Sequence, residues 1–246
     1  MKLETRTIVV NGNKTRYLVG GSGKPLVFLH GWSTNPFSHK PSLEKIAQKF
    51  TVYSPFLFEL NFEDVESMAR SLVDFMQELG LTEVILAGTS FGALIACLVA
   101  CWYPKMVSRL LLINAAGVPS EASRLEMAFD ALDSYVILMF QRKLRVMLYR
   151  WLSGIFFHLS FWRHRMRALA GQLKPKTHIC YIYQELKVKT VIIWSTRDVT
   201  FPLYHAYSLK KMIPNSKLIV AEGTHAWHYH DPELFAKTIA AACDSP

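Results

Sequence analysis

A serine in a glycine-flanked turn is the feature of the sequence best suited to covalent chemistry. Ser90 lies in the sequence G-T-S-F-G at 88–92, between apolar runs at 84–87 and 93–102. A hydroxyl is a weak nucleophile unless the backbone exposes it, a base takes its proton and N–H donors face the developing oxyanion. A sharp turn from a strand into a helix gives that exposure, and its close contacts favour glycine at the flanking positions. The segment therefore predicts a nucleophile elbow with Ser90 at its tip.

An acid and a base follow Ser90 in the chain order that such an elbow uses. Asp198 comes shortly after an apolar run at 191–194, and His225 comes shortly after another at 218–220. We expect both residues on loops that follow strands, at the edge of a parallel sheet where sites are formed. His225 would take the proton from Ser90, while Asp198 would hold the imidazole in the useful tautomer and stabilise the imidazolium.

A third loop contributes to the predicted site from upstream of the elbow. The apolar run at 26–29 leads into His30, Gly31 and Trp32. The glycine lets the backbone approach a substrate, and a backbone N–H of this loop could join that of Phe91 in an oxyanion hole. We therefore expect these three residues to lie at the substrate-binding site.

Alternating strand-like and helix-like segments predict the fold that positions these residues. Eight segments are predicted as strands, at 5–10, 15–19, 25–29, 51–54, 84–87, 109–113, 190–194 and 217–220. Helical periodicity is clearest in four others, at 65–79, 93–102, 206–212 and 232–243. This alternation predicts an α/β fold with a mostly parallel eight-stranded sheet and helices on both of its faces.

Residues 119–189 do not follow that alternation and are predicted to be a helical cap, inserted between the two parts of a core domain at 1–118 and 190–246. Between 134 and 184 there is no acidic residue. The basic residues of this stretch are Arg142, Lys143, Arg145, Arg150, Arg163, Arg165, Arg167, Lys174 and Lys176. Three interpretations stay open: a solvated basic face on a packed segment, a docking surface for an acidic carrier protein or other anionic partner, and contact with an anionic membrane. No recognisable motif accompanies the charge to predict nucleic-acid binding.

With these motifs in order, the chain resembles the α/β-hydrolases of the esterase, lipase and thioesterase kind along nearly its whole length. The resemblance rests on His30-Gly31, the elbow around Ser90, Arg197-Asp198 followed by Pro202, and Gly223-Thr224-His225 followed by Asp231-Pro232-Glu233. It implies a catalytic triad of Ser90, Asp198 and His225, and an oxyanion hole formed by the backbone amides of Trp32 and Phe91. It also implies that the cap covers the active site. The sequence departs from many relatives at 54–59, where an apolar stretch replaces a Gly-x-Gly turn.

The predicted function is hydrolysis of carboxylic esters or thioesters of apolar acyl groups through an acyl-enzyme intermediate. A serine at the elbow, in place of an aspartate, argues against the dehalogenase and epoxide-hydrolase branches of the family. One alternative is a carbon–carbon bond hydrolase of the aromatic meta-cleavage type, which uses the same triad. Another is a lipid-binding or ligand-binding protein that keeps the fold without turnover.

Composition agrees with one catalytic domain. A chain of 246 residues with 51% hydrophobic residues can bury a sizeable core, and its formal net charge is +9. His228 and His230 lie close to His225, but no cysteine or glutamate at ligand spacing accompanies them, so we expect no metal and no cofactor. The four cysteines form no C-x-x-C pattern, and the polar start of the chain does not resemble a signal peptide. These features predict a cytoplasmic protein.

Overall fold

A computed structural model of the chain describes residues 1–32, 34–61, 63–118 and 182–244. Most of the predicted cap at 119–189, including all nine basic residues between 134 and 184, lies outside the described residues. Its predicted boundaries and its predicted partners therefore stay predictions. The described residues come from the two parts of the chain that precede and follow most of this segment.

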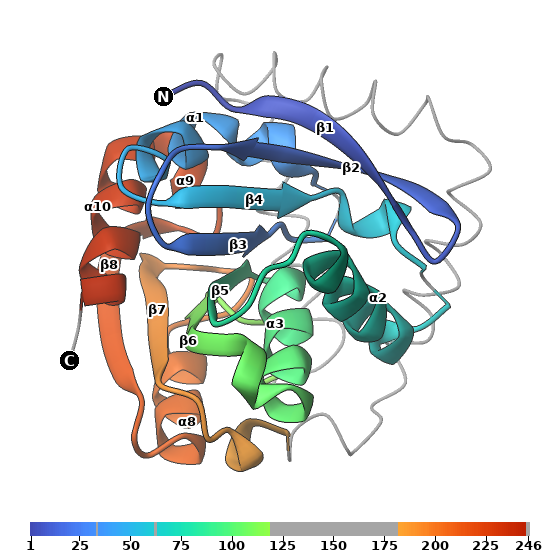
Figure 1. Cartoon of the computed structure of the whole chain (residues 1–246). Coiled ribbons are helices and arrows are strands. Elements are labelled where there is room, and N and C mark those ends of the chain that lie inside the picture. The colour runs from blue at the N-terminus through green and yellow to red at the C-terminus, as the bar shows by residue number, and fades with distance from the viewer. Residues whose placement is uncertain (33, 62, 119–181, 245–246) are drawn as a thin grey trace. The chain divides into compact units, whose positions relative to one another are not determined.

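The described strands form a single eight-stranded sheet, as the sequence predicts (Figure 1). In chain order they are β1 (Glu4–Val10), β2 (Asn13–Gly20), β3 (Pro25–Leu29), β4 (Thr51–Pro55), β5 (Val84–Thr89), β6 (Val107–Ile113), β7 (Thr190–Arg197) and β8 (Lys217–Thr224). Across the sheet their order is β1-β2-β4-β3-β5-β6-β7-β8. β2 runs antiparallel to β1 and β4, whereas the strands from β4 to β8 are mutually parallel. The carboxyl ends of β3, β5, β6, β7 and β8 therefore lie at one edge.

Helices follow most of the parallel strands. The described α-helices are α1 (Pro36–Ile46), α2 (Val65–Glu78), α3 (Phe91–Trp102), α8 (Tyr204–Met212), α9 (Trp227–His230) and α10 (Pro232–Asp244). The described part of the chain also contains three short 3-10 helices, η1 (Leu57–Glu59), η2 (Pro104–Met106) and η3 (Tyr183–Glu185). The helices predicted from periodicity correspond to α2, α3, α8 and α10. α1 and α9 are additional to the predictions.

The two faces of the sheet can be told apart from alternate residues of its strands. Phe28, Ala87 and Ile113 belong to one buried cluster with Leu43 of α1 and Phe235 of α10. Successive side chains of a strand point to opposite faces, so the equally buried residues between them face the other side. There α3 packs against β3, β5 and β6, and α2 packs against α3 (Figure 1). Helices therefore cover both faces, as expected.

The contact between α1 and α9 holds two buried histidines, His39 and His228. Their rings stack with centroids 4.1 Å apart, and the Phe28 ring lies 5.0 Å from that of His39. No group in the described part of the chain forms a hydrogen bond with the ring nitrogens of either histidine. Burial is the main reason that the pKa of each lies well below its ordinary value, and repulsion from neighbouring histidines adds to the effect. Both rings are therefore neutral in the folded protein.

We expect this histidine pair to make the fold sensitive to acid. In the unfolded chain a histidine binds a proton at about pH 6.5, but the folded rings do not. Above about pH 6.5 the two histidines are neutral in both states, and the free energy of unfolding keeps its full value. As the pH falls below that, the free energy of unfolding decreases by up to about 1.4 kcal/mol per pH unit for each histidine. Urea unfolding at pH 7, 6 and 5 measures that loss. His39→Phe should make the pH dependence shallower, whereas His230→Phe, at an exposed position, should not. Equal pH dependence in the wild type and His39→Phe would contradict this assignment.

Candidate active site

Ser90 lies in a strained turn between β5 and α3. Its backbone has φ 53° and ψ −118°, a conformation that is uncommon for residues other than glycine. The Ser90 N–H donates to the carbonyl of Ile113 at 2.9 Å, and the Ser90 carbonyl accepts from the N–H of Ala116 at 3.1 Å. Both partners lie at or just beyond the end of β6. The strand–turn–helix context that the sequence predicts around Ser90 is present, and the loop after β6 supports it.

Close backbone contacts explain the two glycines that flank Ser90. A Cβ added to Gly88 would lie 2.3 Å from the carbonyl oxygen of Gly92. A Cβ added to Gly92 would lie 2.5 Å from the carbonyl oxygen of Leu29 and 2.6 Å from that of His30. These neighbours are backbone carbonyl oxygens, which no side-chain rotation can move aside. The elbow therefore packs directly against the end of β3, at a distance that excludes any side chain.

The two residues predicted to form the oxyanion hole both lie beside the elbow. Phe91 is the first residue of α3, so its N–H is at the positive end of that helix. Trp32 follows Gly31, where an added Cβ would lie 3.8 Å from Ser90 Oγ. The rings of Trp32 and Phe91 meet edge to face with centroids 5.1 Å apart. The structure thus places both residues next to Ser90.

Asp198 and His225 come together at the ends of β7 and β8. Asp198 Oδ2 accepts a hydrogen bond from His225 Nδ1 at 2.8 Å, and Asp198 Oδ1 accepts one from the N–H of Phe201 at 2.8 Å. The carboxylate is fully buried, whereas the His225 side chain is 24% exposed. Because an ionised carboxylate only accepts hydrogen bonds, Nδ1 carries the proton of the neutral imidazole and Nε2 is left as an acceptor. This is the tautomer that a general base needs.

Sequence analysis did not single out Asn114, a fully buried residue directly after β6 that also bonds to Asp198. Asn114 Nδ2 donates to Asp198 Oδ2 at 2.5 Å and to Ser195 Oγ at 2.8 Å. Its Oδ1 accepts from Trp227 Nε1 at 3.2 Å. A lone asparagine after a strand belongs to no motif. Its place after a predicted parallel strand, like those of Ser90 and Asp198, is the signal that could have found it.

His30, which the sequence predicts at the substrate site, has both ring nitrogens bonded to the backbone. Nδ1 donates to the carbonyl of Gly31 at 2.9 Å, and Nε2 accepts from the N–H of Leu57 at 3.1 Å. The residue is only 1% exposed. His30 therefore fixes the start of η1 against the end of β3, and its contact with a substrate stays a prediction.

An aromatic wall, formed by Phe58, Trp32 and Phe91, lies where the sequence departs from the Gly-x-Gly pattern. The Phe58 ring of η1 stacks on that of Phe91, with centroids 6.0 Å apart and planes at 10°. The Trp32 ring meets Phe58 edge to face at 5.2 Å. The apolar stretch at 54–59 thus brings a large ring to the residue that follows the proposed nucleophile.

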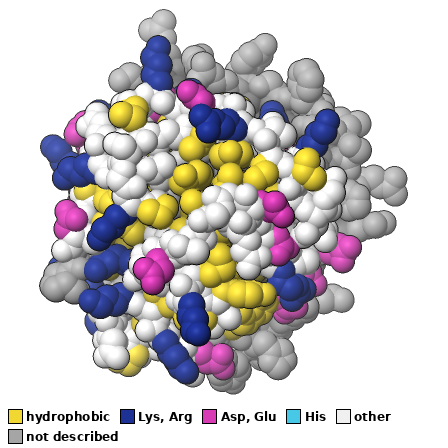
Figure 2. Space-filling view, in the orientation of Figure 1, with side chains coloured by type: hydrophobic (Ala, Val, Ile, Leu, Met, Phe, Trp, Pro, Cys, Tyr) yellow, Lys and Arg dark blue, Asp and Glu magenta, His cyan; other side chains and the backbone are white. Residues whose placement is uncertain are grey.

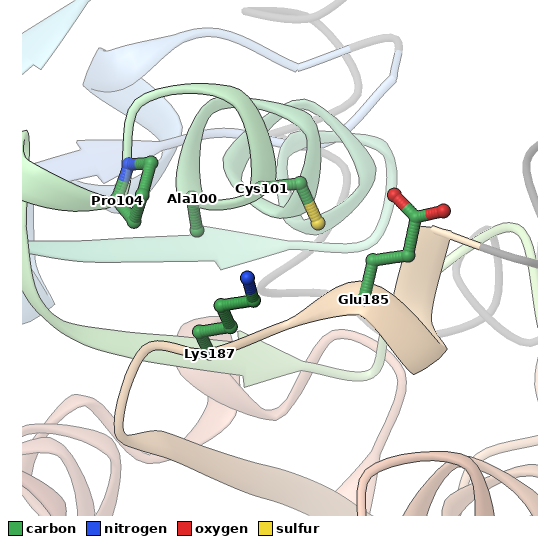
Figure 3. A pocket seen from close by; sticks show the side chains of 5 residues that line it. All are labelled: Ala100, Cys101, Pro104, Glu185 and Lys187. Carbon is green, nitrogen blue, oxygen red and sulfur yellow. The ribbon is translucent and has the colours of Figure 1, made fainter.

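A separate cleft lies at the opposite end of α3 from Ser90 (Figure 3). It has a volume of about 280 Å³ and is lined by Ala100, Cys101, Pro104, Glu185 and Lys187. At 1.5 Å per residue, the length of α3 places Cys101 roughly 16 Å from the elbow. The Cys101 thiol donates to the carbonyl of Ile182 at 3.1 Å. This cleft is therefore not part of the candidate active site.

The described surface mixes basic and acidic side chains on the face shown in Figure 2. Among the residues with described placement, no helix is both long and apolar enough to cross a membrane. Within the same residues, no three side chains of the metal-binding types lie close enough together to hold a metal ion. His228, near His225 in sequence, is instead packed in the pair with His39.

Known proteins share both the sequence pattern and the fold. The family model described as alpha/beta hydrolase family matches residues 26–238. An uncharacterized protein of Mycobacterium tuberculosis (strain ATCC 25618 / H37Rv) is 25% identical over 99% of this chain and 81% of its own. Lipase 1 of Psychrobacter immobilis is 23% identical over 89% of this chain and 77% of its own. The 2-hydroxy-6-oxo-6-phenylhexa-2,4-dienoate hydrolase of Rhodococcus sp. strain RHA1 has a similar structure, with a TM-score of 0.85 and 14% identity over 99% of both chains.

Proposed function

Because the chain belongs to the alpha/beta hydrolase family, we propose that it is a serine hydrolase that cleaves carboxylic esters or thioesters of apolar acyl groups. The observation that carries the proposal is the hydrogen bond from His225 Nδ1 to the buried Asp198 carboxylate. It lies at the sheet edge that also carries the Ser90 elbow. An ordered acid–base pair and a partly exposed serine at one edge are the parts that acyl transfer requires.

The proposed reaction proceeds through a covalent acyl-enzyme. Ser90 Oγ attacks the acyl carbon while His225 Nε2 takes the hydroxyl proton, and the amides of Trp32 and Phe91 stabilise the charge on the carbonyl oxygen. The tetrahedral intermediate collapses, and His225 returns the proton to the leaving alkoxide or thiolate. Water then attacks the acyl group with His225 again as base, which releases the acid and restores Ser90. Asp198 stays ionised and stabilises the imidazolium throughout.

The aromatic wall supports an apolar acyl group as the substrate moiety. Phe91 directly follows the nucleophile, and the Trp32 and Phe58 rings pack against it. Apolar surface beside the reacting carbonyl favours an acyl chain that leaves water on binding. An acidic carrier protein or an anionic membrane as the source of that chain is a further proposal, based on the basic residues between 134 and 184 in the sequence.

Carbon–carbon bond hydrolysis is the second candidate activity. It uses a serine, a histidine and an aspartate in the same roles, and the Rhodococcus hydrolase, whose structure has a TM-score of 0.85 to this chain, supports keeping it. A lipid-binding or ligand-binding role without turnover is the third candidate. The three differ in two observable properties, reaction with a serine-directed probe and turnover of esters.

A fluorophosphonate probe is expected to label Ser90 covalently, because the activated Oγ displaces fluoride from phosphorus. Mass spectrometry of the digested protein locates the added mass, and heat-denatured protein should show none. Turnover of nitrophenyl esters from acetate to dodecanoate should peak at one chain length. Labelling without ester turnover would favour carbon–carbon hydrolysis. Neither labelling nor turnover would favour the binding protein.

A further inference from the structure

We propose that Asn114 is a positioning residue that holds the Asp198 carboxylate in the orientation in which it bonds to His225. The inference rests on the proposed hydrolase function. Asn114 Nδ2 and His225 Nδ1 donate to the same carboxylate atom, Asp198 Oδ2, at 2.5 and 2.8 Å. Together with the N–H of Phe201 on Oδ1, these donors fix the carboxylate from both ends. Without the Asn114 donor, His225 is the only one of these donors left on Oδ2, and the carboxylate is held less firmly.

The direction of the Asn114 amide is set by the groups around it. The Trp227 indole N–H can only donate, so it must face Oδ1 of Asn114, to which it lies at 3.2 Å. The amide NH₂ then faces Asp198 and Ser195, whose oxygens both accept from it. Trp227 is 1% exposed in the core. A turned amide would leave the buried indole N–H unpaired, a costly arrangement, so the donor stays on Asp198.

The backbone segment that carries Asn114 also contacts the Ser90 elbow. The φ of Asn114 is 44°, a left-handed conformation that asparagine tolerates better than most residues. Its N–H donates to the carbonyl of Ile193 in β7. On either side of it, the carbonyl of Ile113 and the N–H of Ala116 bond to the backbone of Ser90. One short segment after β6 therefore sets the position of both the nucleophile and the acid.

An uncharged donor is well suited to this position. An amide N–H stabilises the Asp198 anion without bringing a positive charge that would compete with the imidazolium formed during catalysis. Two described titratable groups interact with the Asp198 carboxylate: His225, which bonds to it, and His205, on which its charge acts. Replacing the amide donor with a group that competes for Oδ2 should therefore act on the His225 bond directly.

Asn114→Asp is the variant that tests this role. It keeps the shape, tolerates the left-handed backbone and leaves an oxygen to accept from Trp227, but it places a carboxylate against Asp198. Two carboxylates so close share one proton, which would occupy the oxygen that His225 uses. We expect kcat for ester hydrolysis to fall by about 10- to 100-fold at pH 7 with KM little changed. Activity should partly recover at higher pH, so the acid limb of the kcat/KM profile moves to higher pH.

Ser195→Ala is the matched control. It removes the other acceptor of the same Asn114 NH₂ group and leaves Asp198 and His225 in contact, so neither kcat nor the pH profile should change. A purely structural role for Asn114 predicts a lower kcat with an unchanged profile in Asn114→Asp. A lower kcat with an unchanged pH profile in Asn114→Asp would overturn the proposal, and so would a wild-type kcat in Asn114→Asp.

A readout without turnover separates this proposal from the proposed function. In the wild type the His225 Nδ1 proton should give a low-field proton NMR signal, which should shift or vanish in Asn114→Asp and persist in Ser195→Ala. If the wild type neither labels nor hydrolyses esters, the hydrolase proposal fails, and the NMR signal still decides whether Asn114 positions Asp198.

If Asn114→Asp does not fold, Asn114→Gly is the second test variant, because glycine suits the φ of 44° and lacks the amide. Asn114→Gly should lower kcat, and the activity should not recover at high pH. If Asn114→Gly kept both the wild-type kcat and the wild-type NMR signal, the proposal would be overturned.

Discussion

Ser90→Ala is expected to lower kcat for ester hydrolysis by about a millionfold, the order of loss seen when a triad nucleophile is removed. Without Oγ no acyl-enzyme forms, while the His225–Asp198 bond stays intact. Alanine keeps the Cβ, so the strain of the turn at φ 53° is the same and folding should not change. Steady-state hydrolysis of the best nitrophenyl ester by both proteins measures the effect, and fluorophosphonate labelling should disappear with it.

An exposed serine provides the control for this experiment. Ser22 lies on the surface, away from the carboxyl ends of the parallel strands, and Ser22→Ala should keep wild-type turnover and labelling. If Ser90→Ala retained more than about one hundredth of the wild-type kcat, far above the residual activity expected without the nucleophile, another group would be the nucleophile. The proposed mechanism would then be wrong even though the fold is that of the family.

Gly92→Ala is expected to destabilise the fold by about 4 kcal/mol or more, a loss that marks a severe steric conflict. In an ordinary helix the same change stabilises by about 1 kcal/mol. Here the new Cβ would lie 2.5 Å from the carbonyl oxygen of Leu29 and 2.6 Å from that of His30. These are backbone atoms at the end of a central strand, so the elbow and β3 would have to separate. Urea unfolding followed by circular dichroism measures the loss.

Gly80→Ala separates that conflict from the ordinary cost of replacing a glycine. Gly80 has φ 64° and no atom within 4 Å of an added Cβ. Its replacement should cost about 1–2 kcal/mol, the penalty of a left-handed backbone alone. If Gly92→Ala cost no more than Gly80→Ala, the close approach of the elbow to β3 would not be a constraint on the protein.

The sheet and the order of its strands along the chain were predictable because buried parallel strands form short apolar runs with loops at their ends. The same logic predicted that Ser90, Asp198 and His225 would follow strands at one edge. The structure puts Asp198 and His225 in hydrogen-bond contact and the His30-Gly31 turn against Ser90. Motif and strand position together therefore predicted most of the candidate site.

Features that depend on tertiary contacts were not predictable in the same way. α1 contains Pro41 and buries His39 and Ser42, so its pattern differs from that of an amphipathic helix. α9 is only four residues long, too short to show periodicity. The partners of Asn114 lie 81, 84 and 113 residues away in the chain. No local pattern can indicate a side chain whose role is defined by such distant partners.

The adjacency of β6 and β7 has a consequence for how this protein can be altered. These strands pair side by side, Leu110 beside Thr190 and Ile113 beside Ile193, although the long segment at 119–189 separates them in the chain. Because the two strands are parallel, the segment runs from the carboxyl end of β6 to the amino end of β7, and the sheet fixes these two attachment points at opposite ends of neighbouring strands. Closing a longer loop between fixed ends costs only about 0.6 kcal/mol per doubling of its length. The segment can therefore be exchanged as a module, by evolution or by an engineer, while the sheet and its carboxyl edge are inherited unchanged.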